Sequence, residues 1–156
     1  MSPEVFKDFI IGCCFILAEV LIFQHLSFFG STPDPLLIYV LWLAIKYDRV
    51  QLVIFAAILG FLQDALFDYW GLNMFAKTLM CFSFFNFVNQ NKEGRLLIWQ
   101  IFLVLFAASI FHNLIFLGLS SFVEAYTSGF IPIIFTLGNS LYTALLGSML
   151  FIFKGN

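Results

Sequence analysis

Residues 33–49 read PDPLLIYVLWLAIKYDR, an uninterrupted apolar run that begins at Pro-Asp-Pro and ends at the basic residues Lys46 and Arg49. One apolar run precedes this stretch and four follow it, with short gaps between them. The first, third and fifth gaps contain no Lys or Arg. The basic residues outside the runs lie before the first run, in the second and fourth gaps and after the last run: Lys7, Lys46, Arg49, Lys92, Arg95 and Lys154.

This alternation predicts a membrane topology, because Lys and Arg accumulate in the cytoplasmic loops of membrane proteins. Alternate connections of the chain are therefore expected on the cytoplasmic side. We predict a polytopic all-α protein with six transmembrane helices and with both termini in the cytoplasm (N-in and C-in). Lys77, which lies inside an apolar run, is the one basic residue outside the pattern.

The composition favours the same class of protein. The chain is 62% hydrophobic and 10% charged, with a mean hydropathy of +1.02, whereas soluble domains are about 45–50% apolar. Because the tails and gaps are only a few residues long, we expect no catalytic domain outside the membrane. The net charge of −2 gives no reason to expect a nucleic-acid partner, so the lipid bilayer is the expected environment.

We expect a single integral membrane domain over residues 1–156. Its six spans are predicted at about 9–29, 34–46, 50–67, 72–88, 96–122 and 130–153. The second span is short, with ten apolar residues between Pro35 and Lys46, whereas a crossing needs about 17–25. It can cross only if it reaches back toward Gly30 or if the bilayer thins around it.

A small set of polar side chains lies inside these spans. Each ionisable group in hydrocarbon costs about 2.5–3.5 kcal/mol on insertion scales, so its presence needs a reason. Most of the set lies in the outer half of the predicted bundle, which predicts a polar recess that opens outward and an apolar cytoplasmic half. The candidates for this recess are Glu19, His25, Asp64, Asn73, Lys77, His112, Asn113 and Asn139. No catalytic group, metal site or cofactor is expected.

Asp64 and Lys77 are the expected ion pair of the recess. They lie at similar depth on two spans joined by the tight connection 68–71, so opposite charges on neighbouring helices would let both enter the membrane. Glu19 has no basic residue at its own depth. Three states stay open for it: protonated, hydrogen-bonded to Asn139 or His112, or exposed in a cavity.

Small residues recur at every fourth position along two spans. Ala56 and Gly60 lead to Asp64 in one, and Ser140, Ala144 and Ser148 follow Thr136 in the other. Such spacing lets helix backbones approach closely. We interpret both series as packing inside the bundle rather than as docking faces for an outside helix.

Three motifs carry a resemblance to a known family. They are Pro33-Asp34-Pro35 before an apolar helix, GFLQDAL at residues 60–66 and GLNMFAKTL at residues 71–79. Together they resemble the rod shape-determining protein MreD family of bacteria, whose length and six-span topology also match. The likeness covers about a third of the chain, and Ala56 and Cys81 stand where many members carry Gly.

The resemblance implies a non-enzymatic, multi-pass scaffold of the bacterial cytoplasmic (inner) membrane. Such a protein would take part in the cell-elongation machinery, in rod-shape maintenance and in side-wall peptidoglycan synthesis. Its implied partner is an MreC-like bitopic protein, and through it the peptidoglycan polymerase complex and MreB-like filaments.

A second family remains as an alternative. The substrate-binding S component of an energy-coupling-factor vitamin transporter is also a six-span protein of similar size with an outward-opening pocket, so an S-component-like bundle fits both interpretations. That family docks its transport partner through an Ala-x-x-x-Ala pattern in its first span. Here the first span contains a single alanine, Ala18.

Overall fold

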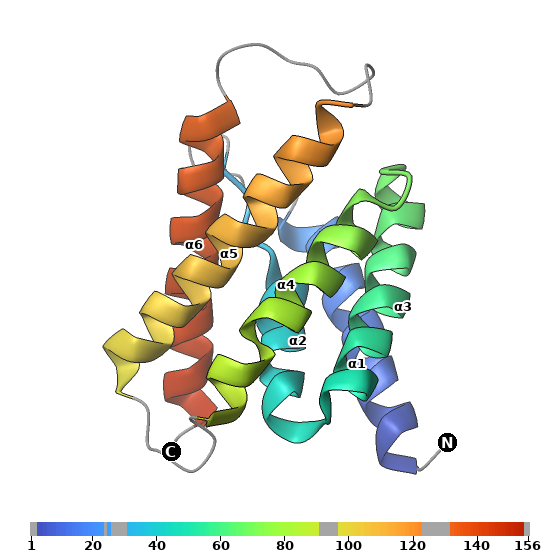
Figure 1. Cartoon of the computed structure of the whole chain (residues 1–156), viewed down its shortest axis with the longest axis vertical. Coiled ribbons are helices and arrows are strands. Elements are labelled where there is room, and N and C mark those ends of the chain that lie inside the picture. The colour runs from blue at the N-terminus through green and yellow to red at the C-terminus, as the bar shows by residue number, and fades with distance from the viewer. Residues whose placement is uncertain (1–2, 24, 26–30, 91–96, 123–131, 155–156) are drawn as a thin grey trace.

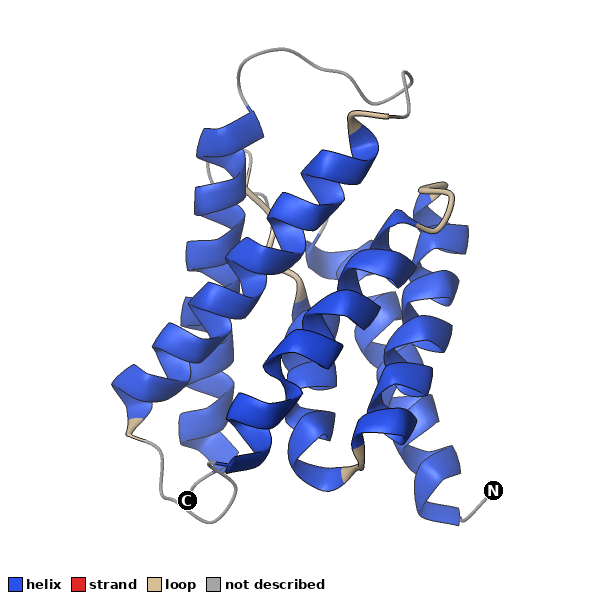
Figure 2. Ribbon diagram, viewed as in Figure 1, coloured by secondary structure: helices blue, strands red, loops and turns tan. Residues whose placement is uncertain are grey.

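The computed structural model describes residues 3–23, 25, 31–90, 97–122 and 132–154. Over these residues the chain is helical and contains no β-strand (Figures 1 and 2), so the all-α prediction is confirmed. In chain order the elements are α1 (Pro3–Ala18), the short π-helix η1 (Glu19–Phe23), α2 (Pro35–Lys46), α3 (Arg49–Phe67), α4 (Leu72–Gln90), α5 (Ile98–Ser120) and α6 (Pro132–Lys154).

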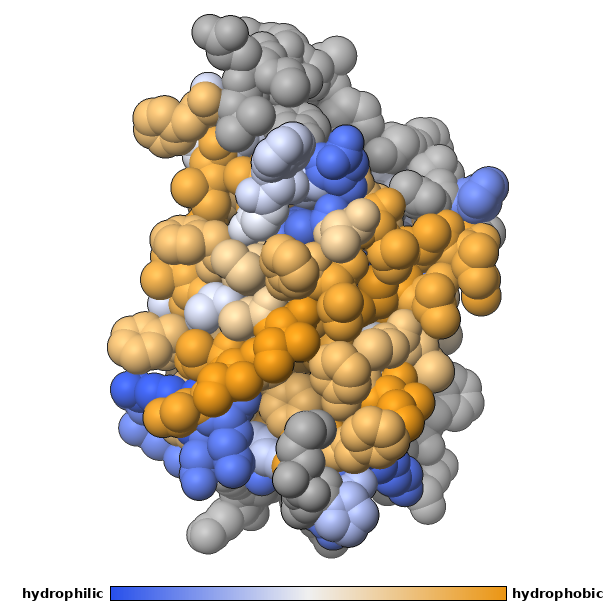
Figure 3. All heavy atoms as spheres, turned by 90° about the vertical axis from the view of Figure 1, so that its right-hand side faces the viewer, coloured by the Kyte–Doolittle hydropathy of each residue, from blue (hydrophilic) through white to orange (hydrophobic). Residues whose placement is uncertain are grey.

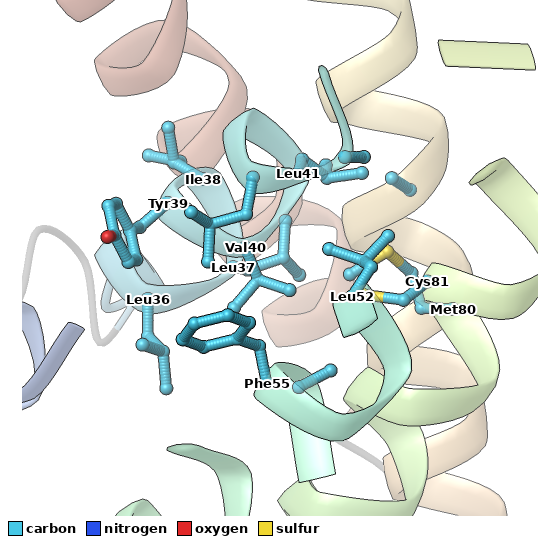
Figure 4. Packing of buried hydrophobic residues seen from close by; sticks show 14 of the residues in the cluster. Leu36, Leu37, Ile38, Tyr39, Val40, Leu41, Leu52, Phe55, Met80 and Cys81 are labelled. Carbon is cyan, nitrogen blue, oxygen red and sulfur yellow. The ribbon is translucent and has the colours of Figure 1, made fainter. Parts of the chain in front are cut away.

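The shortest α-helix, α2, lies at the centre of the bundle and packs against each of the other five α-helices. Its side chains at Leu36, Leu37, Val40 and Leu43 are fully buried. They form the apolar core together with residues of α3 and α4, among which Leu52, Phe55, Met80 and Cys81 are labelled in Figure 4. At 1.5 Å per residue its 12 residues extend only about 18 Å, which is less than the roughly 30 Å of a bilayer's hydrocarbon core.

The chain enters α2 in extended form rather than as a helix that reaches back toward Gly30. The backbone N–H of Thr32 donates to Asn139 Oδ1 at 2.9 Å, and the N–H of Asp34 donates to Thr143 Oγ1 at 3.0 Å. The carboxylate of Asp34 then caps α2 by accepting the N–H of Leu37 at 2.8 Å. Side chains of α6 thus satisfy backbone groups that a helix would have paired internally.

Helices α3 and α4 form a tight antiparallel hairpin. Three residues of the turn, Asp68, Trp70 and Gly71, have positive φ angles of 60°, 50° and 89°. Further along the pair, a Cβ atom added to Gly60 would lie 2.7 Å from the backbone Cα of Met74. The absence of a side chain at Gly60 therefore sets how closely the two helices approach.

The two series of small residues pack inside the bundle, as predicted. Ala56 and Gly60 on α3 are buried. On α6, Ser140 and Ala144 are fully buried, and Thr136 and Ser148 are 8% exposed.

By length and hydropathy, two of the described helices, α3 and α5, could cross a membrane. Large apolar side chains are nevertheless exposed on all six α-helices. On α6 they recur every four residues, at Leu137, Leu141, Leu145 and Met149, where a helix of a soluble protein would carry polar side chains. Figure 3 shows apolar residues across the middle of one face, with hydrophilic residues toward both ends.

A cluster of polar side chains joins α1 to the end of α2. Asp8 Oδ2 accepts hydrogen bonds of 2.6 Å from both Lys46 Nζ and Tyr47 Oη. Burial by itself would raise the pKa of Asp8, but the bonds from Lys46 and Tyr47 outweigh it and hold that pKa below its ordinary value. In Figure 1, the start of α1, the α2–α3 connection and the end of α6 lie at the same end of the bundle.

Candidate functional site

A half-open cavity of about 160 Å³ lies between the elements at the opposite end of the bundle from Asp8. Five of the eight residues predicted for a polar recess line it: Glu19, Asn73, His112, Asn113 and Asn139. The rest of the lining consists of Phe23, Thr32, Pro33, Asp34, Gln63, Phe67, Tyr69, Phe116 and Thr143. The polar side chains come from η1, the extended segment before α2, and helices α3 to α6.

The central charge of the site is the ammonium group of Lys77 on α4, which is fully buried. Its Nζ lies 2.6 Å from Oδ2 of Asp34, whose side chain is 17% exposed. The predicted ion pair between Lys77 and Asp64 is therefore wrong. Asp34 takes the place of Asp64 because the extended chain before α2 brings it beside α4, an approach that spacing along the α3–α4 hairpin does not reveal.

Asp64 instead caps the start of α4. Its two carboxylate oxygens accept the backbone N–H groups of Asn73, at 3.0 Å, and of Met74, at 2.8 Å. A carboxylate at a helix N-terminus satisfies donors that have no partner within the helix and complements the helix dipole. This capping accounts for a buried Asp at the end of α3 without a cation beside it.

A chain of hydrogen bonds leads from Lys77 to α6. Lys77 Nζ lies 3.5 Å from His112 Nε2, and His112 Nδ1 lies 3.3 Å from Asn113 Oδ1. Because an ammonium group can only donate, Nε2 must accept and the proton of a neutral imidazole is on Nδ1. Asn113 Nδ2 then donates to Ser140 Oγ at 3.0 Å, and Ser140 donates to the carbonyl oxygen of Thr136 at 2.8 Å. Each group in this series of hydrogen bonds donates to the next one, in the direction from Lys77 toward α6.

Glu19 is the second carboxylate that lines the cavity. It stands first in the π-helical turn η1 and accepts a hydrogen bond of 2.7 Å from Gln63 Nε2. Its bond thus goes to Gln63, and not to Asn139 or His112, as one of the three open alternatives had it. The other oxygen atoms of this pair, Glu19 Oε2 and Gln63 Oε1, are buried and have no hydrogen-bond partner in the described part of the chain.

The remaining predicted residue, His25, is exposed and is not among the residues that line the cavity. The polar lining residues missing from the predicted set are Thr32, Asp34, Gln63, Tyr69 and Thr143. The Pro-Asp-Pro signal could have pointed to Asp34, but it indicates only a helix start. The others carry no sequence signal that separates them from ordinary polar residues.

The site combines one buried ion pair, a second carboxylate, several amides and aromatic rings. This is a set of groups suited to binding rather than to nucleophilic attack. Within the described residues, no group of three or more His, Cys, Asp or Glu side chains could hold a metal ion. No protein-family model matches the chain, and neither the curated proteins nor the solved structures compared with it include a match.

Proposed function

We propose that the protein is a six-span, multi-pass scaffold of the bacterial cytoplasmic membrane that acts by holding partner proteins. Every α-helix has exposed apolar side chains, which supports a lipid-facing exterior. Soluble monomers rarely expose large contiguous apolar patches. The short α2 is compatible with this proposal. Irregular backbone is tolerated at membrane depth where protein surrounds it, and residues 32–34 are bonded to α6.

The observation that carries the proposal concerns the motifs of the MreD resemblance. Asp34, from the first motif, pairs with Lys77, from the third. Asp64, from the second, caps the helix on which Lys77 lies. The residues that carry the resemblance therefore contact one another or support the same helix. This is expected if the three motifs form one structural core and not if each likeness arose by chance. This supports a role like that of MreD, with an MreC-like bitopic protein as partner.

The geometry favours a scaffold over a carrier. The cavity of about 160 Å³ is smaller than the roughly 300–1,000 Å³ of typical ligand pockets. Beyond it, toward the end that contains Asp8, the core around Leu43, Leu52 and Phe55 is apolar. A solute bound in the cavity would meet no polar route across this layer of described residues.

The half-open, polar cavity is also the one observation that favours the alternative function. An S component of an energy-coupling-factor transporter needs an outward pocket for its vitamin. The two functions differ in what accompanies the protein when it is isolated in mild detergent: a stoichiometric single-span protein for the scaffold, and a retained vitamin-like molecule for the S component.

Co-purification of an MreC-like protein with tagged variants tests the scaffold. We expect Lys77→Met to reduce partner recovery and to disturb rod shape, because it disrupts the core that the three motifs share. Glu4→Gln, a change at an exposed residue of α1, is the matched control and should leave both unchanged. Saturable vitamin uptake that requires this chain together with an ATP-driven module would refute the scaffold and establish the S component.

A further inference from the structure

The walls of the cavity include aromatic rings set at right angles. The rings of Tyr69 and Phe116 meet edge to face, with centroids 5.4 Å apart and planes at 80°. Phe67 stacks on Tyr69 at 5.6 Å with an angle of 4° between the planes. Phe23 of η1 adds a fourth ring to the lining. Aromatic faces arranged around a cavity attract organic cations through the negative potential above each ring.

The ionisable groups of the cavity carry an excess of negative charge when Glu19 is ionised. The charge of Asp34 is balanced by Lys77 at 2.6 Å. Because Asp34 caps α2, its carboxylate is also stabilised by the positive end of the helix dipole. His112 is neutral when its Nε2 accepts from Lys77. Glu19 accepts a side-chain hydrogen bond from the neutral amide of Gln63. When Glu19 is ionised, its charge is the one that has no matching cation among the described residues that line the cavity.

Two buried amides have unpaired polar atoms at the same place. Asn73 is 5% exposed and lines the cavity, but its side chain forms no hydrogen bond in the described structure, because the bonds at this residue involve its backbone. Gln63 is 2% exposed and its Oε1 is without a partner. Buried polar groups are normally hydrogen-bonded, so the unpaired atoms of these two amides indicate a ligand that carries a polar group.

The size of the cavity limits that ligand. Its volume of about 160 Å³ is close to the roughly 150 Å³ of an engineered cavity that admits benzene. It can therefore hold a molecule or head group of about six or seven non-hydrogen atoms.

We propose that this cavity binds a small amino alcohol. The ammonium group is held against the rings of Tyr69 and Phe116 by cation–π attraction and by the charge of Glu19, and the hydroxyl group bonds the amide of Asn73. The ammonium group can belong to a free amino alcohol or to the head group of an amine-bearing phospholipid. This inference does not depend on the scaffold role, since it concerns the isolated chain.

Binding of choline to the purified protein in mild detergent tests the proposal, with 3,3-dimethylbutan-1-ol as its uncharged isostere. We expect choline to raise the midpoint of thermal unfolding saturably and the isostere to have no such effect. Glu19→Gln should weaken choline binding at least tenfold. Asp48→Asn, which removes an exposed carboxylate at the opposite end of the bundle, should bind choline as the wild type does. Equal binding of choline and its isostere, or full choline affinity in Glu19→Gln, would overturn the proposal.

Phe116→Leu provides a second variant, because it keeps every charge and removes one ring face. It should weaken choline binding several-fold. Unchanged affinity would contradict the proposed cation–π contact even if Glu19→Gln fails to fold. Dihexanoylphosphatidylcholine, used below its micellar concentration, separates the two sources of the ammonium group. If this lipid binds more tightly than choline, the site belongs to a lipid head group. If it binds more weakly, the site belongs to a free amino alcohol. Binding of neither probe refutes the site.

Discussion

Lys77 is the residue on which the polar core depends most. Its side chain is fully buried, and its ammonium group has a carboxylate oxygen of Asp34 at 2.6 Å and a histidine nitrogen at 3.5 Å. A buried charge without a partner is far more costly than a buried pair. The two members of the pair differ, however, because Asp34 also has a helix N-terminus and partial exposure to the cavity.

We expect Asp34→Asn to destabilise the protein more than Lys77→Met. The asparagine can still accept the N–H of Leu37, but it leaves the ammonium group of Lys77 without a counter-charge, a loss of about 3–5 kcal/mol in comparable buried pairs. Lys77→Met leaves a carboxylate that still has the Leu37 N–H. The midpoint of thermal unfolding in detergent measures both effects. The double variant should lose less than the sum of the single variants, and strict additivity would contradict the pair.

Asp8 predicts a pH dependence at the other end of the bundle. Because its pKa in the folded protein is held below the ordinary value, its contribution to stability is complete above the unfolded pKa of about 3.9 and is lost as the pH falls through the folded pKa. Asp8→Asn should therefore reduce the loss of stability between pH 6 and pH 3. Tyr47→Phe, which removes one of the two donors, should have an intermediate effect. An unchanged acid sensitivity in Asp8→Asn would show that the cluster contributes nothing.

At the scale of single residues, the sequence identified some of the polar side chains that gather at the cavity but not how they pair. Five of the eight candidates line one cavity, because burial in an apolar bundle leaves polar groups few other places. The partner of Lys77 was predicted from depth along a hairpin. That reasoning considers neighbours along the chain and cannot include Asp34, which is 43 positions away.

At the scale of the helices, the close approach of α3 and α4 rests on Gly60. A Cβ atom at this position would lie 2.7 Å from Met74 Cα and 3.0 Å from Met74 N, and the same N–H donates to Asp64. The helices must move apart to accept a methyl group, which would weaken that cap as well.

Gly60→Ala should therefore destabilise the protein by about 1–3 kcal/mol, as overpacked cores do. Gly118→Ala on α5 is the matched control, because nothing lies within 4 Å of the added Cβ and alanine favours a helix by about 1 kcal/mol relative to glycine. Thermal unfolding should thus shift in opposite directions for the two variants. A shift of the same sign and size would mean that the helix contact does not depend on Gly60.

The predicted spans 34–46, 50–67 and 72–88 end within two residues of α2, α3 and α4, because proline, aspartate and basic residues mark those ends in the sequence. The entry into α2 was not predictable in the same way. Its backbone is satisfied by Asn139 and Thr143 of α6, more than a hundred positions later, so no local pattern records it. The predicted span 9–29 falls partly outside the described residues, which include η1 but not residues 26–30.

At the scale of the whole molecule, the six-span proposal requires the two ends of the bundle to lie on opposite sides of the membrane. The α3–α4 turn lies at the cavity end, where Trp70 is 84% exposed. The α2–α3 connection, with exposed Asp48, lies at the end where α1 begins (Figure 1). Lys46 and Arg49 flank Asp48, and such basic connections stay in the cytoplasm. Accessibility of these two positions from outside the cell therefore decides the topology.

Single cysteines in a background that lacks Cys13, Cys14 and Cys81 measure this accessibility in the full-length chain. In intact cells, a membrane-impermeant maleimide should label Trp70→Cys and should label Asp48→Cys only after the membrane is permeabilised. Both positions are exposed turns, so a difference in labelling reflects the side of the membrane rather than burial. Protection of both positions, or labelling of both, would place the two turns on one side. An odd number of crossings between them would then be impossible, and α3 could not be a membrane span.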